Sequence, residues 1–550
     1  MLHGNYDNSL RLLRLIIRRE RLTSVVWVII LVLFSAAIAP AMAEMFSETE
    51  TRSQFAASVN NPIMVSMMGP IYGIDNYTPG AMYGGMMLLW YIIAVAIMNI
   101  FFVVRHTRAD EEYGRAEVVR SLPTGRLANV NATMISALIL NAVVALFTGL
   151  GIAATGVESM DLGGSLLYGA AAGAAGLVFA AIAALFSQLS SNKSGASGLS
   201  LLSLFAFYML RAVGDVQGNE IISCISPLGL VQRTQAYIEN NIWPTLLLLL
   251  TAVVISAAAY KLNSIRDLGQ GFIAARRGRA AAPAGLLSPF GLAWRLLRFM
   301  LLIWTVMMFV LAASYGSVIA DISTFVGDSP EYMTIIGVPV DMLDKIPAAD
   351  QEKLIVDSFG TFVTLMMTLV CIVPLLNAAL RVRTEEREGR AEHIMARVVP
   401  RWKYLAGYVA IAYATSIVIQ FATASGLYYS AAALTGDANP FTFSGLLEEY
   451  FAYLPALWVM IGVAVFIVGL FPKATGAVWG YFGVVCFTSF VGSLVLPEWL
   501  LKVSPLHFIP QPQPFEQFTL DFTPLIVLTV IAAVLTAAGF IFYTKRDTVS

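Results

Sequence analysis

Twelve long apolar runs constrain this chain more than any other feature of its sequence. They lie at about 25–43, 82–104, 130–155, 164–187, 196–212, 242–260, 297–319, 358–380, 405–433, 452–471, 474–496 and 524–543. Runs of about 20 apolar residues are long enough to cross the ~30 Å hydrocarbon core of a bilayer as helices, and such helices satisfy their own backbone hydrogen bonds. Only 13% of the residues are charged, against about 25% in a soluble domain. The pattern predicts an all-α polytopic membrane protein with about twelve transmembrane helices.

Lysine and arginine are distributed unevenly between the two ends of the predicted helices. With the N-terminus in the cytoplasm, the predicted cytoplasmic segments contain 28 of the 34 Lys and Arg residues. Cytoplasmic loops carry an excess of these residues, so we expect a plasma-membrane protein with both termini cytoplasmic. A signal peptide cleaved after Ala43 is the alternative for the first run. We reject it because the second half contains a matching internal segment.

The two halves of the sequence repeat each other. The segment 108–117, RADEEYGRAE, aligns without gaps with 383–392, RTEEREGRAE. Shorter matches follow the same order: Ser226-Pro227-Leu228 with Ser504-Pro505-Leu506, Arg266-Asp267 with Arg546-Asp547, and the RLLR segments at 11–14 and 295–298. Each half holds an even number of predicted helices, so the sequence predicts two parallel six-helix repeats. We place the first half at 1–260, a cytoplasmic linker at 261–288 and the second half at 289–550.

Several kinds of chemistry are missing from the sequence. No ionisable residue lies deep inside a predicted span, which leaves little chemistry for coupling to an ion gradient. The phosphate-binding pattern G-x-x-x-x-G-K-[ST] is absent, and the cysteines and histidines show no metal-ligand spacing. The net charge of −1 gives no indication of nucleic-acid binding. We therefore expect a chain without catalytic residues, metal or cofactor, whose energy arrives from another protein.

The repeated charged loop is the predicted contact with that other protein. Gly114 and Gly389 occupy the same place in the two copies, and each weakens a helix by about 1 kcal/mol relative to alanine. A kink or the close approach of another backbone would explain the two glycines. A solvated segment that only sets membrane topology is the alternative. It explains the arginines but not the paired glutamates, and we prefer a docking role.

Two further repeated features have structural predictions. The basic amphipathic stretches Leu10–Leu22 and Phe290–Phe299 are expected to lie in the membrane interface, or else to continue the following span. The Ser-Pro-Leu copies predict broken or re-entrant elements on the outer side. Of the two longer outer loops, 44–81 and 320–357, the second could form a short amphipathic helix near 348–356.

The acidic Gly-Arg-Ala-Glu loop, followed by a proline and a basic residue, resembles a loop of the type-2 permeases of ATP-binding-cassette (ABC) exporters. The doubled form resembles the polyketide-antibiotic, or tetronasin-type, exporters. The resemblance covers the whole chain, although only the loop motif is specific. It implies that the loops are coupling helices that dock on two copies of a separate ATPase subunit, which binds ATP and Mg. The implied docking residues are Asp110, Glu111, Glu112, Gly114, Arg115, Glu117, Glu385, Glu386, Gly389, Arg390 and Glu392.

The resemblance also implies an alternating-access pathway lined by the second and fifth spans of each half. The residues that it places near this pathway are Trp90, Asn99, Phe205, Tyr208, Met366, Asn377, Tyr481 and Phe487. Ordinary helix packing is the alternative for each of them. The implied substrate is a hydrophobic or amphipathic compound, such as an antibiotic, a drug or a lipid. The rival functions are a proton-coupled multidrug carrier of the major-facilitator type, which the missing buried carboxylates disfavour, and a membrane enzyme, for which no catalytic constellation is present.

Overall fold

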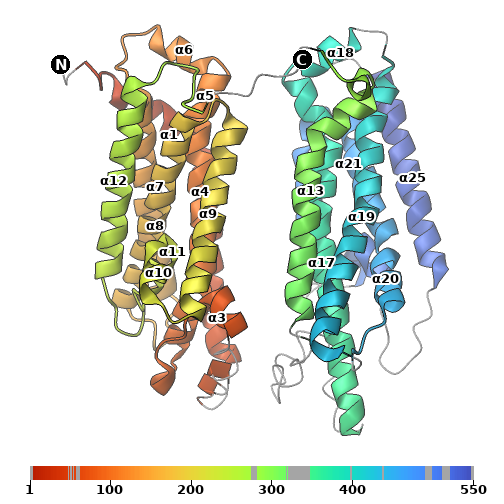
Figure 1. Ribbon diagram of the computed structural model, residues 1–550, viewed down its shortest axis with the longest axis horizontal. Helices are drawn as coiled ribbons and strands as arrows, with labels where there is room; N and C mark the ends of the chain where they lie inside the picture. The colour runs from red at the N-terminus through yellow and green to blue at the C-terminus, as the bar shows by residue number, and fades with distance from the viewer. Residues whose placement is uncertain are drawn as a thin grey trace. The chain divides into compact units, whose positions relative to one another are not determined.

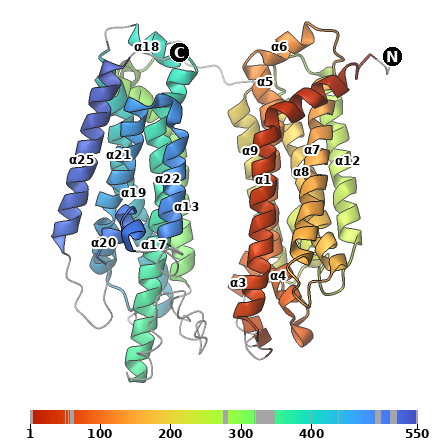
Figure 2. The same ribbon diagram turned by 180° about the vertical axis from the view of Figure 1, so that it is seen from behind.

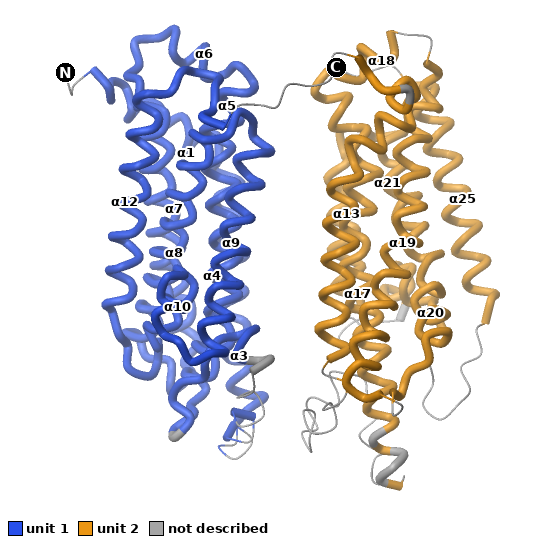
Figure 3. The backbone as a smooth tube through the Cα atoms, viewed as in Figure 1, with its two compact units in different colours: residues 1–278 blue, residues 279–550 orange. Residues whose placement is uncertain are grey.

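The computed structural model divides into two compact units, residues 1–278 and residues 279–550 (Figure 3). The boundary falls inside the segment 261–288 that we predicted as the linker. The structure describes residues 4–47, 62–273, 281–317, 347–396, 399–436, 439–489, 498–510 and 521–546, with residue 319 and a few residues between 48 and 61. The linker residues 274–280 and most of the loop 320–357 lie outside this description.

Unit 1 is a bundle of six long helices (Figure 1). These are α1 (Ser9–Met45), α4 (Pro79–His106), α7 (Ala128–Ala153), α8 (Leu162–Leu189), α9 (Lys193–Val216) and α12 (Trp243–Ile265). Helix α8 is the most buried of them and packs against α4, α7, α9 and α12. Glycines make this close packing possible. A Cβ on Gly169 would lie 2.1 Å from the carbonyl oxygen of Ala145 on α7.

Unit 2 repeats the same packing pattern. Its long helices are α13 (Pro289–Gly316), α17 (Ala348–Arg387), α19 (Arg401–Thr435), α21 (Leu454–Leu470) and α25 (Phe522–Lys545), with shorter α20 (Phe443–Ala452) and α22 (Gly476–Phe487). The first long helix packs on the third, the second on the fourth, and the fourth on the last, as α1–α7, α4–α8 and α8–α12 do in unit 1. Close packing again relies on glycine, since a Cβ on Gly469 of α21 would lie 2.4 Å from the carbonyl oxygen of Gly539 on α25. The repeat found in the sequence is therefore also a repeat of helix packing.

Eleven helices among the described residues are long and apolar enough to cross a membrane. This confirms the prediction of an all-α polytopic membrane protein. The remaining predicted run, 474–496, contains the apolar helix α22, and its residues 490–496 lie outside the described part of the chain. Most observed helices extend beyond the predicted runs, because polar and charged residues at both ends continue the helical geometry.

The segments flanking the spans bear on three smaller predictions. The amphipathic stretches Leu10–Leu22 and Phe290–Phe299 are the first turns of α1 and α13, so each is continuous with the helix that follows, and their place in the membrane interface stays a prediction. Figure 2 shows these first turns of α1 running at an angle to the rest of the helix. The helix suggested near 348–356 is the start of α17. Both Ser-Pro-Leu copies interrupt regular helix, because a new short helix begins at the proline of each copy. These helices are α11 (Pro227–Gln232) and η7 (Pro505–Phe508).

Candidate functional site

The repeated charged segment lies at one end of each unit, which we call the charged end. It forms short helices in unit 1, whereas in unit 2 its first part, up to Arg387, is the end of α17. In unit 1 it forms α5 (Arg108–Glu112) and α6 (Arg115–Arg120) directly after α4 (Figure 1). Gly114 joins them with φ of 70°, and Gly389 has φ of 72° before α18 (Arg390–Met395). Within the described part of the chain, no atom beyond the neighbouring residues lies within 4 Å of a Cβ built on either glycine. The glycines therefore serve a left-handed turn, which side chains disfavour; the close approach of another protein's backbone stays a prediction.

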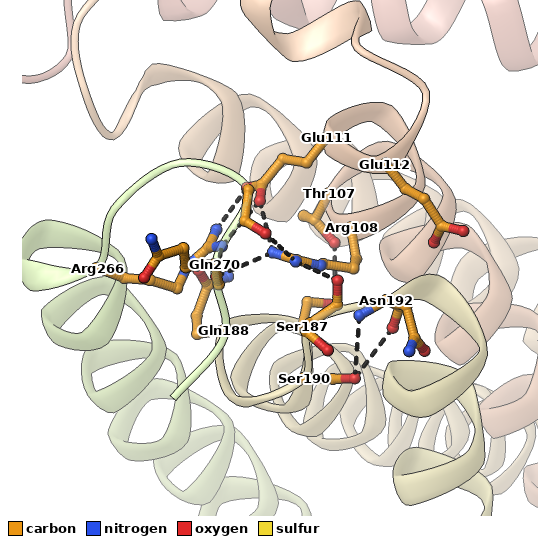
Figure 4. Close-up of polar contacts among 12 residues, drawn as sticks. Thr107, Arg108, Glu111, Glu112, Ser187, Gln188, Ser190, Asn192, Arg266 and Gln270 are labelled. Carbon is orange, nitrogen blue, oxygen red and sulfur yellow. Dashed lines mark hydrogen bonds and ion pairs between the residues drawn. The ribbon is translucent and has the colours of Figure 1, made fainter. Parts of the chain in front are cut away.

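In unit 1 this segment is held by a buried ion cluster around Glu111 (Figure 4). The guanidinium of Arg266, just beyond α12, binds the Glu111 carboxylate through both nitrogens, at 2.5 and 2.8 Å. Arg108 Nη1 donates to the same carboxylate at 2.7 Å. The three side chains are 8% (Glu111), 3% (Arg266) and 1% (Arg108) exposed. A two-nitrogen pairing of this kind fixes orientation as well as distance, so α5 and the end of α12 are locked together.

Arg108 extends this cluster to the neighbouring loop. Its guanidinium donates to the carbonyl oxygens of Gly269 at 2.8 Å, Gln270 at 3.1 Å and Ser191. Close by, the Glu112 carboxylate accepts a hydrogen bond from the backbone N–H of Lys193 at 2.6 Å. The second charged-end loop, between α8 and α9, is thus joined to the repeated segment through two separate contacts.

Unit 2 carries the same cluster at the aligned positions. Arg546, just beyond α25, contacts both oxygens of Glu386 at 2.7 Å. Arg383 Nη1 donates to Glu386 at 3.4 Å, and its Nε donates to the carbonyl oxygen of Pro472 at 2.9 Å. The Arg266-Asp267 and Arg546-Asp547 repeats and the acidic loop repeats therefore meet in space. The arrangement occurs twice and holds the two copies of the loop in the same way.

The predicted docking residues divide into inward and outward groups. Glu111 and Glu386 face their own units, and Glu385 is buried between Arg381 at 2.8 Å and Arg390 at 2.6 Å. The hydrogen bond to Glu385 raises the pKa of Arg390 above its usual range. These carboxylates position the loop. The exposed members of the predicted set are Glu112, Arg115, Glu117, Arg390 and Glu392.

The start of α1 is also attached to the charged end of unit 1. The Glu20 carboxylate binds Arg105 at 3.0 Å and the buried His106 at 3.2 Å, both at the end of α4. Arg19 binds Asp110 at 3.1 Å. Our sequence reasoning missed this contact. The signal available was a single acidic residue, Glu20, inside the otherwise basic segment 18–21.

The predicted pathway residues lie on α4, α9, α17 and α22, but in different surroundings. Asn99 is fully buried in unit 1 and exchanges two hydrogen bonds with Asn141, at 2.7 and 3.0 Å. Side chains that are exposed on their own unit are Trp90, Phe205 and Phe487. The rest are half-buried: Tyr208, Met366, Asn377 and Tyr481. The structure thus shows that Asn99 joins α4 to α7, and a pathway role for all eight residues stays a prediction.

The fold and the duplicated charged ends define a polytopic membrane protein built from two similar units. Comparison with known proteins identifies its class as that of the permeases. The family model described as multidrug efflux system permease Rv1217c, C-terminal domain, matches residues 11–261 and residues 286–544. The multidrug efflux system permease protein Rv1217c of Mycobacterium tuberculosis (strain ATCC 25618 / H37Rv) is 33% identical over 553 aligned positions, which cover 99% of this chain and 96% of that protein. The chain belongs to this family of multidrug efflux permeases.

Proposed function

We propose that this chain is the membrane-spanning permease of an ATP-driven ABC exporter, related to the tetronasin-type subgroup. Two copies of a separate ATPase subunit would bind ATP and Mg and dock on α5–α6 and α18. The charged ends and both termini would lie on the cytoplasmic side of the plasma membrane. The exported compound would be hydrophobic or amphipathic, in keeping with the apolar spans and with the relative's name as a multidrug efflux permease.

The observation that carries this proposal is the duplicated ion cluster beneath each charged segment. A loop that only sets topology needs exposed arginines but has no need of a buried carboxylate between two guanidiniums. Glu111 and Glu386 hold the segment rigidly against the last helix of their units. The same segment exposes Glu117 and Glu392 at matching positions. A docking element requires a fixed position and an exposed face for its partner. The ion cluster provides the first, and the exposed glutamates provide the second.

The ion clusters around Glu111 and Glu386 also connect the proposed docking surfaces to the long helices. In unit 1 α5 follows α4 after a single residue, and the Arg266–Glu111 ion pair ties it to the end of α12. A force applied to α5–α6 would therefore act on the second and the last long helices together. In unit 2 the segment is continuous with α17 up to Arg387 and is tied to α25 through Arg546. Closure of two docked ATPase subunits would move the corresponding helices of both units.

A charge reversal at the exposed glutamates tests this function. The variant Glu117→Lys/Glu392→Lys should abolish substrate-stimulated ATP hydrolysis by the assembled complex, because each docking face would repel its former partner. Glu239→Lys changes an exposed acid outside the charged end and serves as the matched control. The chain should stay folded, as judged by gel filtration in detergent. Transport that persists without ATP and stops with an uncoupler would instead support the proton-coupled carrier.

A further inference from the structure

A cavity of about 300 Å³ lies at the charged end of unit 1, between α1, α5–α6, the start of α7 and the segment after α12. It is much larger than the ~30 Å³ share of one water molecule. Apolar side chains form part of its wall, including Leu12 and Leu15 of α1 and Val119 of α6. It lies behind the repeated charged segment, so whatever fills it supports that segment from the side of the bundle.

The charges in the cavity wall are mainly positive. Four arginines line it, Arg19, Arg115, Arg120 and Arg126, against two carboxylates, Asp110 and Glu111. Glu111 is already neutralised by the two guanidiniums of the ion cluster. Asp110 is shared between Arg19 at 3.1 Å and Arg115 at 2.8 Å.

Two of the lining arginines therefore lack a carboxylate partner. Arg120 forms no hydrogen bond or ion pair within the described part of the chain, and the only hydrogen bond recorded there for Arg126 is to the carbonyl oxygen of Arg266, at 2.8 Å. Guanidiniums match the oxygens of a phosphate in both charge and geometry. The cavity is therefore suited to an anion.

The rim of the cavity is apolar and exposed. Leu15 on α1 and Val118 on α6 both line the cavity, and they are 57% and 69% exposed. On the same elements but outside the cavity lining, Leu10 and Leu22 of α1 and Leu122 just after α6 are also exposed, at 60–74%. Arginines beside exposed aliphatic side chains are typical of the membrane interface, where the apolar groups enter the acyl region and the cations remain at the headgroups. The binding of a soluble anion would not require these exposed aliphatic side chains.

The corresponding positions of unit 2 provide an internal comparison. In the alignments of the repeats, Arg19 corresponds to Ile303 and Arg120 corresponds to Met395. The ion cluster is present in both units, but these two cavity arginines occur only in the first. Arg19 and Arg120 can therefore be substituted without changing the ion cluster that both units share.

We propose that this cavity is a binding site for the phosphate headgroup of an anionic phospholipid, held by Arg120 and Arg126, with the acyl chains leaving past Leu15 and Val118. A bound lipid would brace α6 against α1 and make the position of the charged segment in unit 1 depend on anionic lipid. The inference requires that the charged end of unit 1 lies at the membrane interface, and it is independent of any ATPase partner.

Lipid retention by the purified full-length chain tests this proposal. The protein is reconstituted in nanodiscs of phosphatidylcholine with phosphatidylglycerol, re-extracted into detergent, and the retained lipids are counted by native mass spectrometry. Wild type should retain one phosphatidylglycerol in preference to phosphatidylcholine. Arg120→Met should weaken retention about fivefold, the effect of one cation near an anionic lipid, and Arg19→Ile/Arg120→Met should weaken it further. Arg21→Met removes an exposed α1 arginine outside the cavity and should leave retention unchanged.

Three results would overturn the proposal. Retention that is equal in wild type and Arg120→Met would show that the cavity does not hold the lipid. Inorganic phosphate binding to the detergent-purified chain, lost in Arg120→Met and without any preference for phosphatidylglycerol, would assign the site to a soluble anion. Loss of a co-expressed ATPase subunit in Arg120→Met, with lipid retention unchanged, would assign the surface to a protein contact.

Discussion

The ion cluster around Glu111 yields the sharpest energetic prediction. Glu111→Gln removes the carboxylate that Arg108 and Arg266 share, and the side chains of these arginines are 1% and 3% exposed. Removing one partner of a buried ion pair typically costs about 3–5 kcal/mol. Glutamine keeps the shape and one hydrogen-bond acceptor, so we expect a cost of about 3 kcal/mol, at the low end of that range. The matched change Glu386→Gln should cost less, about 1–2 kcal/mol, because Arg383 and Arg546 are partly exposed.

Hydrogen exchange of the backbone amides in the segment 109–121 measures this effect directly. A loss of about 3 kcal/mol in opening free energy corresponds to exchange that is roughly 100-fold faster. Glu117→Gln, at an exposed position two residues into α6, should leave the exchange rate nearly unchanged. If the amides of this segment exchange at the same rate in Glu111→Gln and Glu117→Gln, the ion cluster does not hold the charged segment in place. That result would refute the reasoning.

Two further predictions concern the turn and the packing between helices. Gly114→Ala and Gly389→Ala should each destabilise the charged segment by about 1 kcal/mol, because the left-handed turn strains a Cβ, whereas asparagine should be tolerated better; exchange in the same segment measures this. Asn99→Leu should cost about 0.6–1.7 kcal/mol, since it removes both hydrogen bonds between the two side chains and leaves the buried Asn141 Oδ1 without its donor, and thermal unfolding in detergent measures it. Gly176→Ala should be as damaging, because its Cβ would lie 2.1 Å from Asn141 Oδ1.

The spans and the duplication could be predicted from the sequence because each depends on local information. A run of apolar residues long enough to cross a bilayer has few other folds available. Matching motifs in register, such as those at 108–117 and 383–392, need only be read along the chain. The ends of the helices were harder to predict from the sequence. Charged turns such as 108–112 are helical again after a one-residue break at Thr107, which hydropathy does not register.

The ion clusters could not be predicted in this way, although both of their halves were visible as repeats. Arg266 lies 155 positions after Glu111, and nothing in their spacing places one against the other. Only the packing of α8 against both α4 and α12 brings the two together. The same limit explains why Glu111 and Glu386 were grouped with the exposed docking residues. Their burial is a tertiary property, and the motif read alone does not distinguish an outward carboxylate from an inward one.

Asn99 shows a second limit on predicting the role of a residue from the sequence. For a single polar residue in a predicted span, the sequence favours packing between helices, and only the family resemblance implies a pathway. The paired amides of Asn99 and Asn141, with Gly176 against both, place it in the bundle core. Trp90 on α4 and Phe205 on α9 are exposed on unit 1.

The number of ATPase subunits bound by one chain tests the central proposal most directly. Native mass spectrometry of the chain co-purified with its ATPase should find two copies on wild type. One copy should remain on Glu117→Lys and one on Glu392→Lys, and none on the double variant, because each charged segment would carry its own docking site. Two copies retained on the double variant, or none on wild type under conditions that support transport, would contradict the account.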